Sequence, residues 1–534
     1  MTTSGAPPEL ESPLGEATPV IKAEPLGPPA TINRRSSRRN FFKGAAAVAA
    51  GSLGASVVAR QLGGVRNPTP IPAIPDGVTV VPGTLDPDTT WGTPEIRLAR
   101  RITNGVTPEE AQLAKSLGFS GYLDYHLNYS AIDDTAAAAF VATTYPQLVM
   151  DGTALSALTA NVVEQQLQQA TLFRAAFSKR QLFERMVEFW TDHFNISMQK
   201  VGYLKTLDDR DVIRKYALST FPEILKASAH SSAMLVYLDN NTSRYPRVNQ
   251  NYARELMELH TLGVDGGYTQ TDVDEVARCL SGWTIQGRGN FFFDPTGHDY
   301  GSKTFLGNTI AAAPGTGAAG IADGDKVLDV LIHHPSTAKF IATKMIKWLL
   351  RYDPPDAFVT DVAAVYTQTT GNIPAMIRAI LTPLSLPAAP GKHKRPYHFV
   401  ISALRAANPT VTGMVGISNT RLPLVGQQPF TWETPDGFPD KVQYWAGSVM
   451  QRWNFGDYLT ALASGEVIVN VAPLMTVNTP DGIIAAIGNA AFGGQMPADT
   501  RDHVKAYLAA SAITTTRVRE SLALAINSAN FQWY

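Results

Sequence analysis

Two pairs of acidic residues in one short segment have a spacing that suits acid–base chemistry. Glu255 and Glu258 lie three positions apart, and Asp272 and Glu275 repeat the same spacing further along the chain. Residues three apart on a helix share one face, so each pair presents its carboxylates together. If the two helices pack with these faces inward, the four groups converge. We therefore take Glu258 and Asp272 as candidate catalytic residues, acting as general acid or base.

A cation or a basic side chain would have to offset the repulsion between these carboxylates. The candidate metal ligands are His193, Glu255 and His260, and a divalent cation is the one cofactor that they suggest. Both histidines also have a structural interpretation. His193 lies on the apolar stripe of its helix, as a core histidine would, and His260 lies in a last turn, where imidazolium suits the helix dipole. The acidic pairs can likewise be solvated helix faces neutralised by Arg254 and Arg278.

A second polar element follows in a glycine-flanked loop, where His298 and Asp299 are adjacent. Loops held by a rigid scaffold often carry function, and we include both residues among the candidate catalytic residues. They would assist the carboxylates or bind a cation. The alternative is a simple polar turn, because the side chains of neighbouring residues rarely face each other.

The elements that would position these residues are mostly helical. A helix over 252–262, ended by Gly263, carries the first acidic pair. A second helix, capped by Thr269 with Asp272 three residues on, carries the other pair. Between 287 and 307 the pattern changes to short strand candidates around a glycine-rich turn. The sequence therefore predicts a mainly α fold, with one large multi-helix domain over 91–534 and a small antiparallel β insertion near 287–307.

The N-terminal part of the chain has the pattern of an export signal. Arg38 and Arg39 precede the weakly apolar stretch 44–59, which is too short and too rich in Ala and Gly to span a bilayer stably. We expect residues 1–59 to be a disordered extension and a twin-arginine signal peptide, and 60–90 to be a Pro-rich linker. The twin-arginine translocation machinery is thus an expected partner. The expected location is extracytoplasmic: the periplasm, the cell surface or the medium.

Composition excludes several classes of protein. The 45 basic and 46 acidic residues leave a formal net charge of -1, so no global field attracts nucleic acid. Cys279 is the single cysteine, which excludes an intrachain disulfide, c-type haem attachment and an iron–sulfur cluster with several cysteine ligands.

Several segments together resemble the bacterial domain-of-unknown-function 1800 family, from roughly Trp91 to near the C-terminus. They are Trp190-Thr191-Asp192-His193-Phe194, 233–239, 251–265, Ser281-Gly282-Trp283-Thr284, His298-Asp299 with 303–307, and 334–342. The resemblance implies an exported protein, often encoded beside a sulfatase-like exported protein, and supplies no established activity. It implies that the helical hairpin, His193 and His298-Asp299 form one constellation. Thr191-Asp192 departs from the His-Asn that the family commonly has there, which argues against a two-histidine site in that segment.

Two functions from different classes fit these observations. The first is a hydrolase acting on an extracellular polymer such as a glycan, through the carboxylates and His298-Asp299. The second is a non-catalytic binding or assembly partner of the sulfatase-like protein, with the same residues in buried structural networks. Carboxylates exposed in a cleft would favour the first function. Acids that are all paired with Arg254, Arg278 or Lys303 would favour the second.

Overall fold

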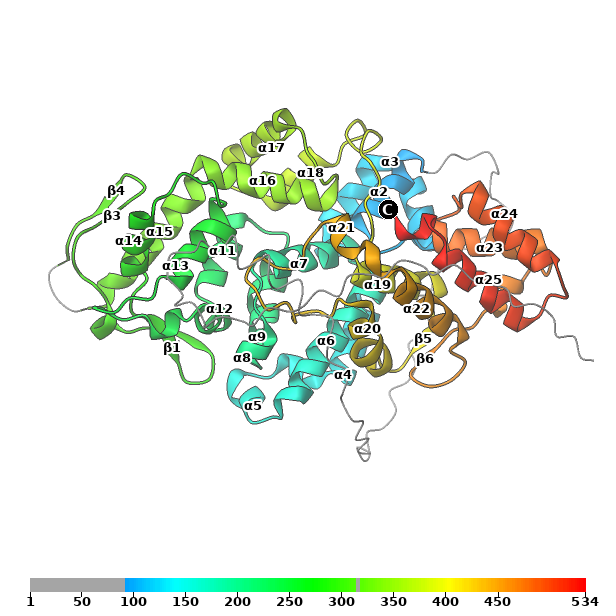
Figure 1. The fold of residues 1–534 in the computed structure, drawn as a ribbon, viewed down its shortest axis with the longest axis horizontal. Helices are drawn as coiled ribbons and strands as arrows, with labels where there is room; N and C mark the ends of the chain where they lie inside the picture. The colour runs from blue at the N-terminus through cyan, green and yellow to red at the C-terminus, as the bar shows by residue number, and fades with distance from the viewer. Residues whose placement is uncertain (1–91, 314–316) are drawn as a thin grey trace, which may run out of the picture. The chain divides into compact units, whose positions relative to one another are not determined.

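The computed structural model describes residues 92–313 and 317–534, which belong to one compact unit spanning Asn67–Tyr534 (Figure 1). The predicted extension and signal of 1–59 and the linker of 60–90 lie outside the described residues. The mainly α fold is confirmed, because 64% of the described residues are helical and their strands form three small antiparallel sheets of two strands each. None of the helices in the described ranges has the length and apolar character needed to cross a bilayer.

The helices run along the whole of the described chain. Those before residue 240 are α2 Pro94–Ile102, α3 Pro108–Leu127, α4 Thr135–Thr144, α5 Gly152–Ser156, α6 Ala160–Phe177, α7 Gln181–His193, α8 Met198–Val201, α9 Leu204–Asp208, α10 Arg214–Tyr216, α11 Phe221–Ala229 and α12 Ser232–Tyr237. Those after it are α13 Asn251–Glu255, α14 Gln270–Cys279, α15 Ile321–His333, α16 Pro335–Leu349, α17 Asp356–Thr369, α18 Ile373–Ile380, α19 Pro396–Ala407, α20 Leu422–Val425, α21 Val442–Trp445, α22 Val449–Ala461, α23 Pro480–Phe492, α24 Ala498–Ala509 and α25 Thr515–Asn527.

The predicted β insertion consists of two successive hairpins. Strand β1 (Trp283–Gln286) pairs with β2 (Asn290–Phe293), and β3 (Lys303–Phe305) pairs with β4 (Asn308–Ile310). The two strand candidates of the sequence, residues 291–293 and 303–306, therefore each pair with a neighbouring strand and not with each other. The β3–β4 turn explains this locally, because Leu306 and Gly307 both have positive φ, as a two-residue hairpin turn requires. A third pair, β5 (Thr410–Val411) with β6 (Val467–Ile468), lies outside the insertion.

Buried apolar side chains form two hydrophobic cores. The first draws on α2, α3, α7 and α11–α18, and the second on α4, α6, α19, α20 and α22–α25. Figure 1 shows helices of the first core in green and the last helices of the second in orange to red. Because α7 belongs to the first core and α19 to the second, charged side chains at their ends meet where the two cores join.

The predicted helical hairpin is present, with one difference. The first helix starts as α13 and continues as a π-helix over Leu256–Thr261, in which the Leu262 amide bonds back to Met257 O. Gly263, with φ 84°, ends it. Thr269 then caps α14, as predicted.

Candidate functional site

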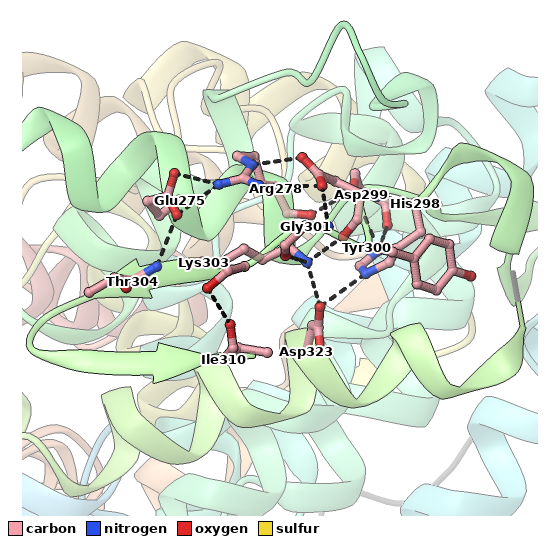
Figure 2. Close-up of polar contacts among 12 residues, drawn as sticks. Glu275, Arg278, His298, Asp299, Tyr300, Gly301, Lys303, Thr304, Ile310 and Asp323 are labelled. Atoms are coloured by element: carbon pink, nitrogen blue, oxygen red, sulfur yellow. Dashed lines mark hydrogen bonds and ion pairs between the residues drawn. The ribbon is translucent and has the colours of Figure 1, made fainter. Parts of the chain in front are cut away.

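Arg278 on α14 holds two acidic residues in place (Figure 2). Its Nη1 donates to both oxygens of Glu275, at 2.7 and 2.9 Å, and its Nε donates to Asp299 Oδ2 at 2.7 Å. Burial acts to raise the pKa of Asp299, but hydrogen bonds from Arg278 and the Gly301 amide outweigh it and hold the pKa below its ordinary value. Asp299 is therefore ionised at neutral pH and serves as a counter-ion of Arg278.

Lys303 and His298 share a further carboxylate, that of Asp323 on α15 (Figure 2). Lys303 Nζ donates to Asp323 Oδ2 at 2.6 Å and to the main-chain oxygen of Asp299. His298 Nε2 lies 3.1 Å from the same Asp323 oxygen, and its Nδ1 lies 2.7 Å from Ser281 O. Both His298 and Lys303 are buried. The charged groups around Asp299 and Asp323 thus find their partners within the protein, as a structural network requires.

The two candidate acid–base carboxylates have separate local contacts. Asp272 Oδ2 accepts from the Thr269 amide at 2.7 Å, and its Oδ1 accepts from the Leu306 amide at 2.7 Å. Asp272 therefore ties the start of α14 to the β3–β4 turn. Glu258 Oε2 accepts from Tyr268 Oη at 3.3 Å. Within residues 92–313 and 317–534, the hydrogen-bond partners of Glu258 and Asp272 are therefore different groups, and neither carboxylate shares a donor with the other.

The candidate metal ligands are all buried. His193 Nε2 lies 3.1 Å from the main-chain oxygen of His260, and the two imidazole centroids are 6.2 Å apart. Burial, assisted by the charge of Lys344, lowers the pKa of both histidines, that of His260 to about 3, so both rings are neutral. Glu255 is buried on α13. In the part of the chain that the structure describes, no group of three or more His, Cys, Asp or Glu side chains is placed to hold a metal ion.

A cavity of about 420 Å³ lies between α7, α16 and the segment 436–443. Its wall combines cations, carboxylates and aromatic rings: Lys344, Lys347, Arg395, Lys441, Asp192, Asp436, Asp440, Phe189, Trp348, Tyr352 and Phe438. His193 also lines it, whereas none of the four candidate catalytic residues does. This cavity therefore includes His193 but not His298 and Asp299, since His298 is held in the network around Asp323.

Arg395, just before α19, neutralises the acidic face of α7. Its Nη1 donates to Asp192 Oδ2 at 2.6 Å, its Nη2 pairs with Glu188, and its guanidinium lies 4.7 Å from the Trp348 ring centroid. Burial nevertheless raises the pKa of Asp192 to about 6, an effect that Arg395 partly offsets. This ion-paired cluster joins the first core to the second.

The segment that closes the cavity is fixed to the end of α7. Asn195 Nδ2 donates to the main-chain oxygens of Trp432 and Thr434, at 3.0 and 2.7 Å. Gly437, with φ 74°, packs so closely against α7 that a Cβ there would overlap the main-chain oxygen of Asp192. These contacts with α7 and Asn195 fix the position of the segment, and with it the positions of Asp436 and Asp440 in the cavity wall.

The family described as "Protein of unknown function (DUF1800)" matches residues 97–533. The chain belongs to the DUF1800 family. The matched range includes the cavity and the network around Asp299 and Asp323. No curated protein and no solved structure matches the chain.

In this DUF1800 chain, Lys344 is a half-buried cation in the cavity wall. Within the described ranges its ammonium makes no hydrogen bond and no ion pair, and it lies 5.6 Å from the Phe340 ring centroid. Burial lowers its pKa to about 8, against the opposing effect of Asp192 and Asp436. At neutral pH the side chain is therefore mostly a cation facing a cavity, with a minor fraction as the free amine.

Sequence reasoning missed this DUF1800 cavity because its residues come from distant segments. Asp192, Lys344, Arg395 and Asp436 are brought together only by the packing of the two cores. One signal was available. Lys344 interrupts the run of apolar residues on α16, and a lysine among buried apolar residues is unusual unless it has a partner.

Proposed function

We propose that this protein works outside the cytoplasm and binds an acidic group of an extracellular polymer, such as an anionic glycan, in the cavity beside Lys344. The observation that carries the proposal is the unpaired Lys344 ammonium in the cavity wall. A partly desolvated cation without a carboxylate partner favours an anionic ligand, because charge-assisted hydrogen bonds are among the strong ones.

The rest of the cavity supports the same kind of ligand. Lys347 and Lys441 add two exposed ammonium groups that have no carboxylate within ion-pair distance among the described residues. The rings of Trp348, Tyr352 and Phe438 offer apolar surface for the C–H face of a sugar. The volume of about 420 Å³ lies within the range of small-molecule sites, about 300–1,000 Å³.

Lys344→Gln tests the proposal. With acidic oligosaccharides, both uronic and sulfated, we expect the affinity measured by calorimetry to fall about 10- to 100-fold, since a hydrogen bond to a charged group contributes about 1.5–3 kcal/mol. Tm should stay the same or rise, because the variant buries no ammonium. Lys339→Gln, on the exposed face of the same helix, is the matched control and should bind as the wild type does. Equal binding by Lys344→Gln and wild type would reject the cavity as the site.

Hydrolysis of the bound polymer is an extension of this proposal. Asp192, with its pKa near 6, and Asp436 line the same cavity, and a carboxyl group with a raised pKa beside a second carboxylate is the arrangement of many glycoside hydrolases. New reducing ends released from the same oligosaccharides would support it. Binding of the oligosaccharides without release of new reducing ends would support a binding protein and contradict hydrolysis.

A second candidate function is assembly with a sulfatase-like exported protein. It is favoured by the ion pairs of Asp299 with Arg278 and of Asp323 with Lys303, which give these acids a structural role. Co-purification of the two proteins after export, unaffected by Lys344→Gln, would favour assembly over ligand binding.

Export by the twin-arginine route belongs to the same proposal. Replacing Arg38 and Arg39 with lysine should retain the full-length precursor in the cytoplasm, because an ammonium does not reproduce the guanidinium fork. Fractionation followed by immunoblotting measures this, with Arg34→Lys and Arg35→Lys together as the control. Normal export of the Arg38/Arg39 double variant would contradict the assignment.

A further inference from the structure

A short basic segment leads into α19, and its three cations differ in how they are neutralised. Lys392 Nζ pairs with Asp440 at 2.7 Å, and Arg395 pairs with Asp192 at 2.6 Å. Lys394 lies between them and is 6% exposed. Within the described residues, its ammonium has no carboxylate and no hydrogen-bond acceptor, and it lies 3.7 Å from the Phe531 ring centroid.

The surroundings of Lys394 add positive charge and unused donors. Arg452 is 1% exposed, and its Nε and Nη1 donate to Ser448 Oγ and Gln532 Oε1, while its Nη2 has no partner. His398 is 2% exposed, and its Nε2 also has no partner. Burial first, and then the charges of Arg100 and Arg452, lower the pKa of Lys394 well below its ordinary value. Among the described residues, Lys394 therefore has cationic neighbours and no carboxylate within ion-pair distance.

A small cavity lies at this group. It measures about 20 Å³, is lined by Lys394, His398, Arg100 and Tyr534 among others, and has room for about one water-sized species. His398 is the third residue of α19, so the cavity also lies beside a helix N-terminus, whose partial positive charge favours anions.

We propose that this cavity binds one small monovalent anion, of the size of chloride, with Lys394 as its counter-ion. Three observations support it: a lysine side chain that is 6% exposed and has no carboxylate or hydrogen-bond partner among the described residues, a buried imidazole nitrogen without a partner, and a cavity of matching size that both residues line. A bound anion would supply a negative charge beside Lys394 and an acceptor for its ammonium and for His398 Nε2 in the tautomer that carries a proton there, both of which line the cavity. The competing account is that Lys394 is buried as a neutral amine, which needs no ion.

The first test compares the purified chain in sodium chloride, sodium bromide and sodium gluconate at one ionic strength. Gluconate is too large for a cavity of this volume. If a halide binds the folded state, chloride and bromide should raise Tm by about 2 °C or more in a saturable way relative to gluconate. A wild-type Tm that is the same in all three salts would overturn the proposal and support the neutral amine.

Two further measurements tie the effect to Lys394. Lys394→Met keeps the length of the side chain and removes its charge, so Tm should become the same in chloride and gluconate. The exposed Lys339→Met is the matched control and should keep the halide response. If Lys394→Met does not fold, the chloride NMR line width is measured with the wild-type protein. Broadening of the chloride line that added bromide reverses would support the site, and a chloride line that is not broadened would overturn it. A halide response that Lys394→Met retains would also overturn it.

Discussion

Arg395→Met should lower the free energy of unfolding by about 3–5 kcal/mol at pH 7, because removing one partner of a buried ion pair leaves uncompensated charge behind. Here two carboxylates, Glu188 and Asp192, lose the same guanidinium. Methionine keeps most of the packing against Trp348, so the loss reports charge more than volume. Chemical denaturation at pH 7 measures it.

The pH dependence of this loss separates charge from packing. In the wild type the pKa of Asp192 is about 6, above its ordinary value of 3.8, so the folded state binds this proton more tightly than the unfolded state does. This group therefore adds stability as the pH falls from about 6 toward 3.8. Without Arg395 its pKa should rise further, and the difference between variant and wild type should shrink between pH 7 and pH 5. Arg395→Lys keeps the positive charge without the two-pronged guanidinium, so its loss of unfolding free energy should be smaller than that of Arg395→Met. A loss that does not change with pH would point to packing and contradict the argument.

Gly437→Ala should be the most damaging small substitution at the cavity. Its φ of 74° costs a non-glycine residue about 1–2 kcal/mol, and the overlap of the new Cβ with Asp192 O adds about 1–3 kcal/mol. Because the overlap is with main chain, the segment 436–443 has to move, and affinity for the acidic oligosaccharides should fall as well.

Gly426→Ala is the control for Gly437→Ala. Gly426 has a similar φ, 88°, and a Cβ there would meet open space. Gly426→Ala has the conformational cost of a positive φ but no overlap of the new Cβ. The difference in unfolding free energy between the two variants therefore measures the cost of the overlap with Asp192 O. Equal losses would show that the close approach of Gly437 to Asp192 has no energetic weight.

Local signals in the sequence were enough to predict much of the fold. Thr269, three residues before Asp272, marked the start of α14, and Gly263 marked the end of the preceding helix, because capping depends on residues that are near one another in the sequence. The strand candidates were found as well, but their partners were not. The left-handed conformation of Leu306, an unusual residue for such a turn, hid the β3–β4 hairpin.

The candidate site was harder to predict, for two physical reasons. Asp272 was assigned both a cap and a catalytic role, and its hydrogen bonds to the Thr269 and Leu306 amides fit the cap. The cavity depends on α7, α16 and the segment 436–443, whose approach follows from the packing of two cores. Periodicity and spacing describe one element at a time, so they do not show that Lys344 and Asp192 line the same cavity.

The backbone of the basic segment has a consequence for when the protein can finish folding. The amides of Lys392 and Lys394 donate to the main-chain oxygens of Tyr534 and Gln532, each at 2.8 Å, so the segment that carries Arg395 is held by residues 532–534. Neither charged cavity has its complete wall until those residues have left the ribosome. A transporter that threads a nascent chain would therefore meet an unfinished protein, whereas one that accepts cargo after synthesis would receive both sites assembled.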